Sequence, residues 1–501
     1  MLEIVRDKSE ALVTEANTLV EQGKVRQATS IYIEAIKSDL TNYRAFYHLG
    51  WCLFKQNRLS EAASFYHYTI DADPQFSQAY FALGELLSQQ KQFKQAISYY
   101  LKSIKLNPNQ FNFYMGLGKA LKAIGSQEQA LSCFQKVINL KPNFLWAYIQ
   151  SGAIWRQQGD YQKAVECYIQ AIQINPNFQA AYTILEFIPI AEEQLDKLID
   201  VYQKIVEQNS QIYQAWANLG DALTQKKQLD KALEAYQQAC YYKTIKAYPQ
   251  IAQSYLKTIN KREPAFIIIG AGKCGTTSLF QYLSQHPQIL PPINKEIDFF
   301  NFNFTQGSDW YLAHFPTLPD EQKFITGEAS PSYFSYLHVE RRLYELFPQT
   351  KIIILLRNPV ARVFSHYHHK IREGAEKRSL EAALNSELNA IRQATEAQLS
   401  YIRGYLGISM YVYKLKRWLS LFPKERVLIL KSEDLYENPA ATMSETCNFL
   451  NIAELKAIAY NRHNSGAYKL QDDKLKQQLK IFFRGYNQQL ETFLDRQFDW
   501  D

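Results

Sequence analysis

The sequence contains no apolar run of about 18 residues, the length that a membrane-crossing helix needs. Glu3 and Asp7 stand near its start, and the apolar core of a signal peptide does not follow them. Both absences predict a protein without a membrane span that is located in the cytoplasm.

Cysteine is scarce and scattered. The six cysteines are Cys52, Cys133, Cys167, Cys240, Cys274 and Cys447. They form no C-x-x-C pair, and no histidine lies near them at the spacing of metal ligands. We therefore expect reduced thiols in a reducing compartment.

A strong excess of one charge is also missing. The net charge of +7 comes from 56 basic and 49 acidic side chains. Such a modest excess fits an anionic ligand, and we expect no nucleic-acid partner. With 47% apolar and 21% charged residues the composition is globular, and a length of 501 residues predicts two or three domains.

The first half of the chain repeats itself every 34 residues. Glycine recurs in phase at Gly50, Gly84, Gly118, Gly152 and Gly220. Alanine recurs in the same phase, and four positions after each alanine stands an aromatic residue, among them Tyr66, Tyr100, Phe134, Tyr168 and Tyr236. Small residues are needed where two helices cross closely, and aromatic rings fill the gap to the next helix.

This pattern resembles the tetratricopeptide repeat, a helix–turn–helix unit of that length. We expect seven units in an α-solenoid over residues 1–246, the sixth degenerate because Glu186 replaces its glycine. Residues 247–263 would form a cap or linker before a domain over 264–501. Stacked repeats form a concave face, which predicts a groove for a protein or peptide partner; a spacing or dimerising scaffold is the alternative.

From residue 264 short apolar runs alternate with helical patterns. The runs are Phe266–Ile269, Lys351–Leu356, Arg426–Leu430 and the weaker Phe324–Gly327. This alternation predicts a P-loop-like α/β domain with a central parallel sheet that helices cover on both faces. Ligands bind at the carboxyl ends of the strands in such sheets. Lys273, Arg357 and the segment Ser432-Glu433-Asp434 should therefore meet there.

The first run leads into a glycine-rich turn, FIIIGAGKCGTTS over residues 266–278. Strand, turn and helix N-terminus together form a cradle for an anion, because free N–H groups and the helix dipole both favour negative charge. A nucleoside triphosphatase loop would carry lysine directly after its last glycine. Here Lys273 precedes Gly275 and Thr276 follows it, which argues against a kinase or triphosphatase.

The run Lys351–Leu356 leads into LLRNPVARVFSHYHH over residues 355–369. Arg357 ends a strand, and Ser365 lies inside the helix that follows. An arginine fork and a neutral hydroxyl can hold one phosphate together. An ordinary junction with an arginine salt bridge is the alternative.

GAGKCGTTSL together with LLRNPVARVFSHY resembles the sulfotransferases that use 3′-phosphoadenylyl sulfate (PAPS), in particular the heparan-type carbohydrate enzymes. Further segments that are similar to that family are KEIDFFN (295–301), GEASPSYF (327–334) and HNSGAYKL (463–470). The resemblance implies that the turn binds the 5′-phosphosulfate, through Lys273, Cys274, Gly275, Thr276 and Thr277. It also implies that Arg357 and Ser365 bind the 3′-phosphate, and that Ser465, Gly466 and Ala467 cover the co-substrate.

The resemblance also makes Glu296 the candidate catalytic base, with Lys273 neutralising charge on the leaving group. Glu328 and Asp298 are the next carboxylates to consider, and His366 is an alternative base. Histidines at 366, 368 and 369 do not share one helix face, so they predict no metal site, and the chemistry needs none because lysine and arginine supply the positive charge.

Three functions remain open at this point. The resemblance favours a PAPS-dependent sulfotransferase with a carbohydrate acceptor, a hydroxyl or an amine, and with repeats that bind a protein. A tyrosyl peptide is the alternative acceptor. The third possibility is a scaffold that binds the nucleotide without catalysis.

Overall fold

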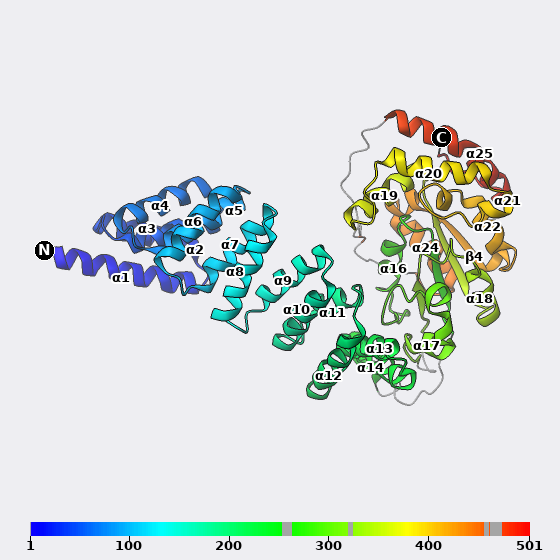
Figure 1. The fold of residues 1–501 in the computed structure, drawn as a ribbon, viewed down its shortest axis with the longest axis horizontal. Coiled ribbons are helices and arrows are strands. Elements are labelled where there is room, and N and C mark those ends of the chain that lie inside the picture. The colour runs from blue at the N-terminus through cyan, green and yellow to red at the C-terminus, as the bar shows by residue number, and fades with distance from the viewer. Residues whose placement is uncertain (1, 253–262, 319–323, 455–459, 461–472, 501) are drawn as a thin grey trace. The chain divides into compact units, whose positions relative to one another are not determined.

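The computed structural model describes residues 2–252, 263–318, 324–454, 460 and 473–500 (Figure 1). The chain divides into two compact units, Met1–Val201 and Tyr202–Asp501.

The first unit is built from helices that pair with their neighbours in sequence. The pairs are α1 (Leu2–Glu21) with α2 (Val25–Ser38), α3 (Tyr43–Lys55) with α4 (Leu59–Ala72), α5 (Ser77–Gln89) with α6 (Phe93–Leu106), α7 (Phe111–Ala123) with α8 (Gln127–Leu140) and α9 (Leu145–Gln158) with α10 (Tyr161–Ile174). The next helices, α11 (Gln179–Glu186) and α12 (Glu192–Gln208), form the degenerate sixth unit. Its first helix is only eight residues long, which agrees with the irregular sequence there.

The phased glycines are needed because an aromatic ring lies directly over each of them. A Cβ atom added at Gly118 would lie 2.6 Å from the ring of Phe134. The same relation joins Gly50 to Tyr66, Gly84 to Tyr100, Gly152 to Tyr168 and Gly220 to Tyr236. Tyr100 also packs on Gly116 of the following unit, so one ring seals both the helix crossing within a unit and the joint to the next.

The second unit begins with the last repeat and continues into an α/β domain. The repeat consists of α13 (Tyr213–Gln225) and α14 (Leu229–Ala247). The sheet has four parallel strands in the order β2-β1-β3-β4. They are β1 (Phe266–Gly270), β2 (Gly327–Ala329), β3 (Lys351–Leu356) and β4 (Val427–Lys431).

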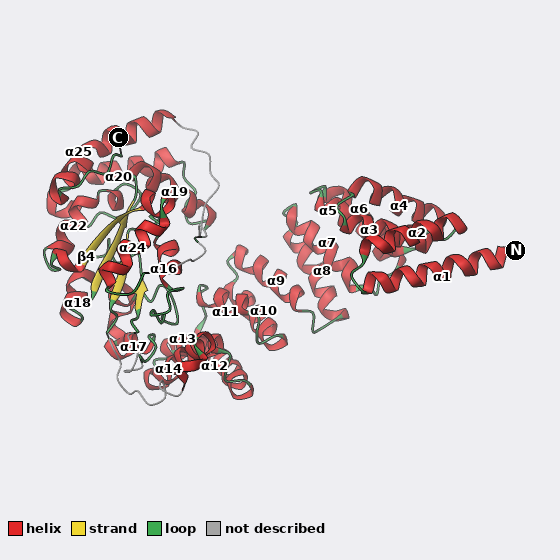
Figure 2. Cartoon of the chain, turned by 180° about the vertical axis from the view of Figure 1, so that it is seen from behind, coloured by secondary structure: helices red, strands yellow, loops and turns green. Residues whose placement is uncertain are grey.

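Helices enclose the sheet, as Figure 2 shows. They are α16 (Thr276–Leu283), α17 (Ser308–Ala313), α18 (Val339–Leu346), α19 (Pro359–Arg372), α20 (Leu380–Gln393), α21 (Glu396–Leu399), α22 (Tyr411–Leu419), α23 (Ser432–Glu437), α24 (Pro439–Leu450) and α25 (Asp473–Leu494). The α/β fold with a parallel sheet is confirmed. The weak run Phe324–Gly327 was placed three residues early: Ile325 makes only an isolated bridge to Ile289, and the strand proper starts at Gly327.

The last repeat packs on α17 of the α/β domain. The indole of Trp310 donates a hydrogen bond to Thr224 Oγ1 at 2.9 Å. The ring of His314, which follows α17, lies over the ring of Tyr236 with 4.0 Å between centroids. In this position α17 covers the ring of Tyr236, whereas the equivalent ring of Tyr100 packs on the next repeat.

The cap expected over 247–263 is described only in part. Pro249–Ile251 form a short 3₁₀ turn, and residues 253–262 lie outside the described residues. The division into a solenoid over 1–246, a linker and a domain over 264–501 therefore stays a prediction. Within the described ranges, no helix combines the length and the apolar composition that crossing a bilayer would require.

A substitution at Gly118 tests the packing of ring on glycine. Gly118→Ala should lower the free energy of unfolding by about 1–2 kcal/mol, because overpacking outweighs the helix propensity that alanine gains. Thermal unfolding followed by circular dichroism measures the change. Gly485→Ala in α25 is the matched control, since nothing lies within 4 Å of the added Cβ; an equal or larger loss there would contradict the packing argument.

Candidate functional site

The turn between β1 and α16 requires glycine at both of its ends. Gly270 and Gly275 have φ angles of +153° and +94°. A Cβ atom would lie 2.5 Å from Phe334 Cβ at the first and 2.8 Å from Tyr436 Oη at the second. Among the residues that the structure describes, no side chain caps the first turn of α16, and the first N–H groups of a helix have no partner within it. The turn therefore presents free donors, as the sequence predicted.

The members of the turn do not all face the same way. Gly272, Lys273, Thr276 and Thr277 line a pocket of about 490 Å³. The side chain of Cys274 is buried instead, with its Sγ 3.7 Å from Tyr411 Oη. Cys274 can thus contribute to the pocket only through its backbone.

Arg357 lies directly against this turn. Its Nη1 donates a hydrogen bond to the carbonyl oxygen of Lys273 at 3.2 Å, although the two residues are 84 positions apart in sequence. Tyr411 fixes the same junction by donating to the Arg357 carbonyl oxygen at 2.8 Å. The segment after β4 joins them, because Glu433 accepts a hydrogen bond from the backbone N–H of Asn358 at 2.9 Å. The three segments expected to meet at the carboxyl edge of the sheet do meet.

Ser365 lies half-buried on α19, the helix that follows Arg357 in the chain. Among the described residues that line the pocket, neither Ser365 nor Arg357 appears. The two thus lie outside the cavity that holds Lys273 and Glu296. Ser465, Gly466 and Ala467 fall outside the described residues, so the expectation for them stays a prediction.

Glu296 is the acidic side chain of the pocket, and it forms an ion pair with Lys295. Apart from Tyr336, the remaining ionisable side chains of the lining are cations and histidines: Lys273, Arg362, His366, His369, Lys370 and Arg403. Lys370 and His369 both pair with Glu373, at 2.8 Å and 2.9 Å. The balance of the lining is positive, which suits a strongly anionic ligand.

The pKa values of the pocket show the same excess of positive charge. Burial lowers the pKa of the Lys273 amine, and the neighbouring Arg372 lowers it further. Burial lowers the pKa of His366 to about 3, again with help from Arg362 and Lys370. A ring with such a low pKa accepts a proton poorly, so His366 is a weak candidate for the base.

Arg362 supports the turn, a role that the sequence analysis missed. Its buried guanidinium donates to the carbonyl oxygens of Gly272 and Tyr405 at 3.0 and 3.1 Å, and to Ser409 Oγ at 2.9 Å. A lone arginine within a helical pattern gives no sign of such contacts. The only available signal was its place one helical turn after Asn358, which itself caps α19.

Glu328 is buried beneath the segment that carries Glu296. Its carboxylate accepts hydrogen bonds from Tyr311, Ser330 and Tyr333 at 2.8, 2.6 and 3.1 Å. The hydroxyls of Ser330 and Tyr333 in turn accept the backbone N–H groups of residues 298 and 299, at 3.2 and 2.8 Å. Glu328 therefore orients the two hydroxyls that hold the chain just after Glu296.

Asp298, the other carboxylate considered, is similarly tied into the structure. It accepts hydrogen bonds from Ser332 and Asn301, and burial raises its pKa. Within the described part of the chain, no group of three metal-binding side chains comes together.

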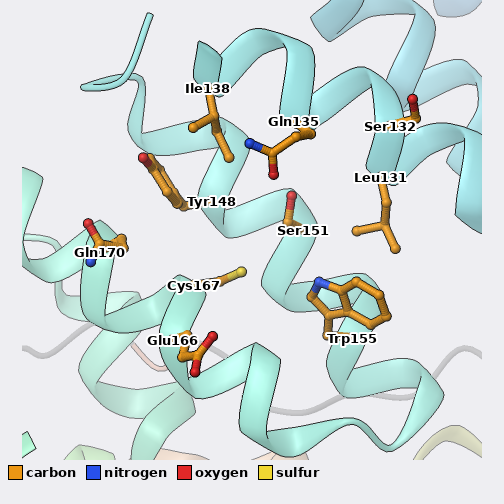
Figure 3. Close-up of a pocket in the computed structure, with 10 residues that line it drawn as sticks. All are labelled: Leu131, Ser132, Gln135, Ile138, Tyr148, Ser151, Trp155, Glu166, Cys167 and Gln170. Atoms are coloured by element: carbon orange, nitrogen blue, oxygen red, sulfur yellow. The ribbon is translucent and has the colours of Figure 1, made fainter. Parts of the chain in front are cut away.

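A second hollow lies in the repeats (Figure 3). It measures about 450 Å³ and is lined by side chains of α8, α9 and α10, including Tyr148, Trp155, Glu166 and Cys167. Its lining combines apolar and polar groups.

Comparison with known proteins assigns both parts of the chain. Residues 263–496 match the family model of the sulfotransferase domain. Models of the tetratricopeptide repeat match residues 13–77, 77–110, 111–144, 146–178 and 186–250. The chain thus consists of tetratricopeptide repeats followed by a domain that belongs to the sulfotransferase family.

Individual relatives are similar over about half of this chain. The membrane-associated sulfotransferase kil1 of Dictyostelium discoideum is 29% identical, over 47% of this chain and 66% of its own length. The human bifunctional heparan sulfate N-deacetylase/N-sulfotransferase 2 is 31% identical, over 47% of this chain and 30% of its own length. A solved sulfotransferase from Alicyclobacillus acidocaldarius is 31% identical, over 48% of this chain and 99% of that one, with a TM-score of 0.41. The chain therefore spans only part of the curated relatives that it matches.

The buried carboxyl of Glu328 should make stability depend on pH. Burial raises its pKa from 4.5 to about 7, so the folded protein holds this proton more tightly than the unfolded chain does. The resulting stabilisation is complete below the unfolded pKa and is lost as the pH rises through the folded one. The Tm of the wild type relative to Glu328→Gln, which cannot ionise, should fall by a few degrees between about pH 5 and about pH 8.

Scanning calorimetry of both proteins across this range tests the expectation. Glu425→Gln, at an exposed position, is the control and should keep a constant difference from the wild type. A constant difference for Glu328→Gln as well would show that its carboxyl does not change ionisation on folding.

Proposed function

We propose that this protein transfers a sulfonate group from PAPS to a hydroxyl or amine of a carbohydrate acceptor. The observation that carries the proposal is the hydrogen bond of 3.2 Å between Arg357 and the carbonyl oxygen of Lys273. It joins a second cationic group to the phosphate-binding turn, so that a nucleotide with phosphates at its 5′ and 3′ positions has a partner for each. Family membership of residues 263–496 supports the same donor.

The donor supplies the activated sulfonate, and this chain supplies the groups that bind and orient it. Lys273 and the N–H groups of Gly275, Thr276 and Thr277 hold the 5′-phosphosulfate, with Cys274 contributing its backbone only. Arg357 and Ser365 hold the 3′-phosphate, Arg357 through a guanidinium that also braces the turn. Arg362 stabilises the turn by donating a hydrogen bond to the Gly272 carbonyl oxygen.

Glu296 is the proposed general base. As the acceptor oxygen or nitrogen forms its bond to sulfur, the bond from sulfur to the bridging phosphate oxygen breaks, and the acceptor proton passes to the Glu296 carboxylate. Lys273 stabilises the charge that develops on the departing phosphate. Burial and neighbouring cations hold the pKa of the Lys273 amine down. The negative charge of a bound phosphosulfate would raise this pKa again.

A carbohydrate acceptor is supported by the relatives, several of which are named as heparan sulfate N-sulfotransferases or glucosamine 3-O-sulfotransferases. Arg403 and Tyr336 line the same pocket as Glu296, and we propose that this pocket receives the acceptor. For the repeats we propose binding of a protein or peptide partner, for which the hollow between α8, α9 and α10 is a candidate contact. A cytoplasmic location is supported by the six cysteines, none of which forms a disulfide in the described part of the chain.

The proposed contact between Arg357 and the 3′-phosphate can be tested by comparing two nucleotides. Arg357→Gln should weaken the binding of adenosine 3′,5′-bisphosphate by about 10–100-fold, since a hydrogen bond to a charged group contributes about 1.5–3 kcal/mol. Binding of adenosine 5′-monophosphate should change by less than about threefold. Isothermal titration measures both, with the exposed Arg341→Gln as the control.

Equal losses for the two nucleotides would contradict this role and leave Arg357 as a brace of the turn only. ATP belongs in the same titration. If ATP bound the wild type more tightly than the bisphosphate does, the kinase or triphosphatase hypothesis would gain and the proposed donor would be wrong.

The proposed role of Glu296 as general base can be tested separately from nucleotide binding. Glu296→Gln should bind the bisphosphate as the wild type does and lose about 10²–10⁴-fold in the rate of sulfonate transfer. Transfer of radiolabelled sulfonate to heparan-type saccharides and to tyrosyl peptides provides the measurement and identifies the acceptor class. Unchanged transfer in Glu296→Gln would exclude it as the base, whereas a wild type that binds the nucleotide and labels no acceptor would favour the non-catalytic scaffold.

A further inference from the structure

Lys243, a residue of the last repeat, holds the backbone of the α/β domain close to Glu296. Its Nζ donates hydrogen bonds to the carbonyl oxygens of Pro292 and Ile293, at 2.5 and 2.7 Å. The side chain is partly buried, and hydrogen bonds from a charged donor are stronger than neutral ones. Ile293, the second of these residues, precedes Glu296 by three positions.

The same short segment is clamped from its other side. The backbone N–H of Ile293 donates to the carbonyl oxygen of His314 at 2.9 Å. His314 is itself fixed by the last repeat, through its ring contact of 4.0 Å with Tyr236 in α14. The Sγ of Cys240, also in α14, donates to the Ala313 carbonyl oxygen at 3.5 Å. The hydrogen bonds at the N–H and at the carbonyl oxygen of Ile293 therefore both depend on residues of α14.

On either side of Glu296 the chain is held by β2 and by the segment that follows β2. The carbonyl oxygen of Lys295 accepts a hydrogen bond from the Ala329 N–H of β2 at 3.2 Å. The N–H of Phe299 is held by Tyr333 at 2.8 Å. Glu296 thus lies in a segment that the last repeat holds at residues 292 and 293. Strand β2 and the residues after it hold the same segment at residues 295 and 299.

We infer that the last tetratricopeptide repeat is a structural part of the transfer site, with Lys243 as a positioning residue for Glu296. This inference rests on the proposed role of Glu296 and adds the group that fixes its location. A displacement of about 1 Å at a reacting group can cost as much as about 100-fold in rate. Loss of the Lys243 contacts should therefore reduce transfer although Lys243 does not line the pocket.

Two lysines of α14 form a matched pair for the test. Lys243 and Lys246 each lie 6.0 Å from the ring centroid of Tyr213. Among the contacts described for this helix, the hydrogen bonds to carbonyl oxygens 292 and 293 belong to Lys243, whereas Lys246 is exposed. Lys243→Met and Lys246→Met remove the same charge and the same ring contact, and only the first removes the hold on the segment.

The experiment uses the full chain and measures kcat, KM, the affinity for adenosine 3′,5′-bisphosphate and hydrogen exchange of the amides at 293–299. Lys243→Met should lower kcat by about 10-fold or more, leave the bisphosphate affinity within about twofold, and speed the exchange of these amides. Lys243→Arg, which keeps a charged donor, should recover most of the rate. Lys246→Met should match the wild type in every measurement.

The inference is overturned if Lys243→Met keeps both the kcat and the exchange rates of the wild type, or if Lys246→Met loses as much as Lys243→Met. Should Lys243→Met fail to fold, Lys243→Gln gives the same comparison, because its shorter amide offers a weaker neutral donor. Failure of the proposed function gives a different result: the wild type would transfer no sulfonate, while faster exchange in Lys243→Met would still show that the repeat holds the segment.

Discussion

The site depends on the parallel pairing of β1 with β3. Ile268 pairs with Ile353, and after an irregularity Gly270 pairs with Ile354. The first N–H of the turn, at Ala271, then donates to the Leu355 carbonyl oxygen at 2.8 Å. This register brings the turn and the residue that ends β3 to the same edge of the sheet, where Arg357 reaches the Lys273 carbonyl. A different register would separate the two cationic groups that a doubly phosphorylated nucleotide needs.

A second constraint lies beneath the proposed base. The segment 293–299 has little regular structure of its own, and loops are positioned by the scaffold around them. Here the scaffold consists of a buried carboxylate, Glu328, with two hydroxyls on one side and of α14 on the other. The last repeat, α13 and α14, thus packs on the α/β domain through its side chains, and these contacts lie next to the segment that carries the proposed base.

Most of the fold could be predicted from the sequence, since it depends on local periodicity. The 34-residue phase of glycine and aromatic residues gave the repeats, because each ring lies over its own glycine. KIIILL and RVLIL gave β3 and β4 because buried parallel strands are continuously apolar. The edge strand β2 was placed three residues early, since three residues carry too little pattern to define a boundary.

The site could be predicted only where its residues share a short motif. Lys273, Thr276, Thr277 and Glu296 do line one pocket, and their motifs pointed to them. The contacts of Arg362 with Gly272, of Glu328 with Tyr311 and of Lys243 with Pro292 could not be predicted from the sequence. They join residues 90, 17 and 49 positions apart, and no periodicity records such pairs. Cys274, predicted as a binding residue, has its side chain buried, since the tight turn directs it inward.

We propose that one nucleotide is held at two points, by the turn around Lys273 and by Arg357 with Ser365. A crystal structure of the full chain with adenosine 3′,5′-bisphosphate tests it most directly. We expect the 5′-phosphate against Lys273 and the N–H groups of residues 275–277, and the 3′-phosphate within hydrogen-bonding distance of Arg357 and Ser365. A 3′-phosphate in solvent, or a nucleotide bound away from the turn, would contradict it.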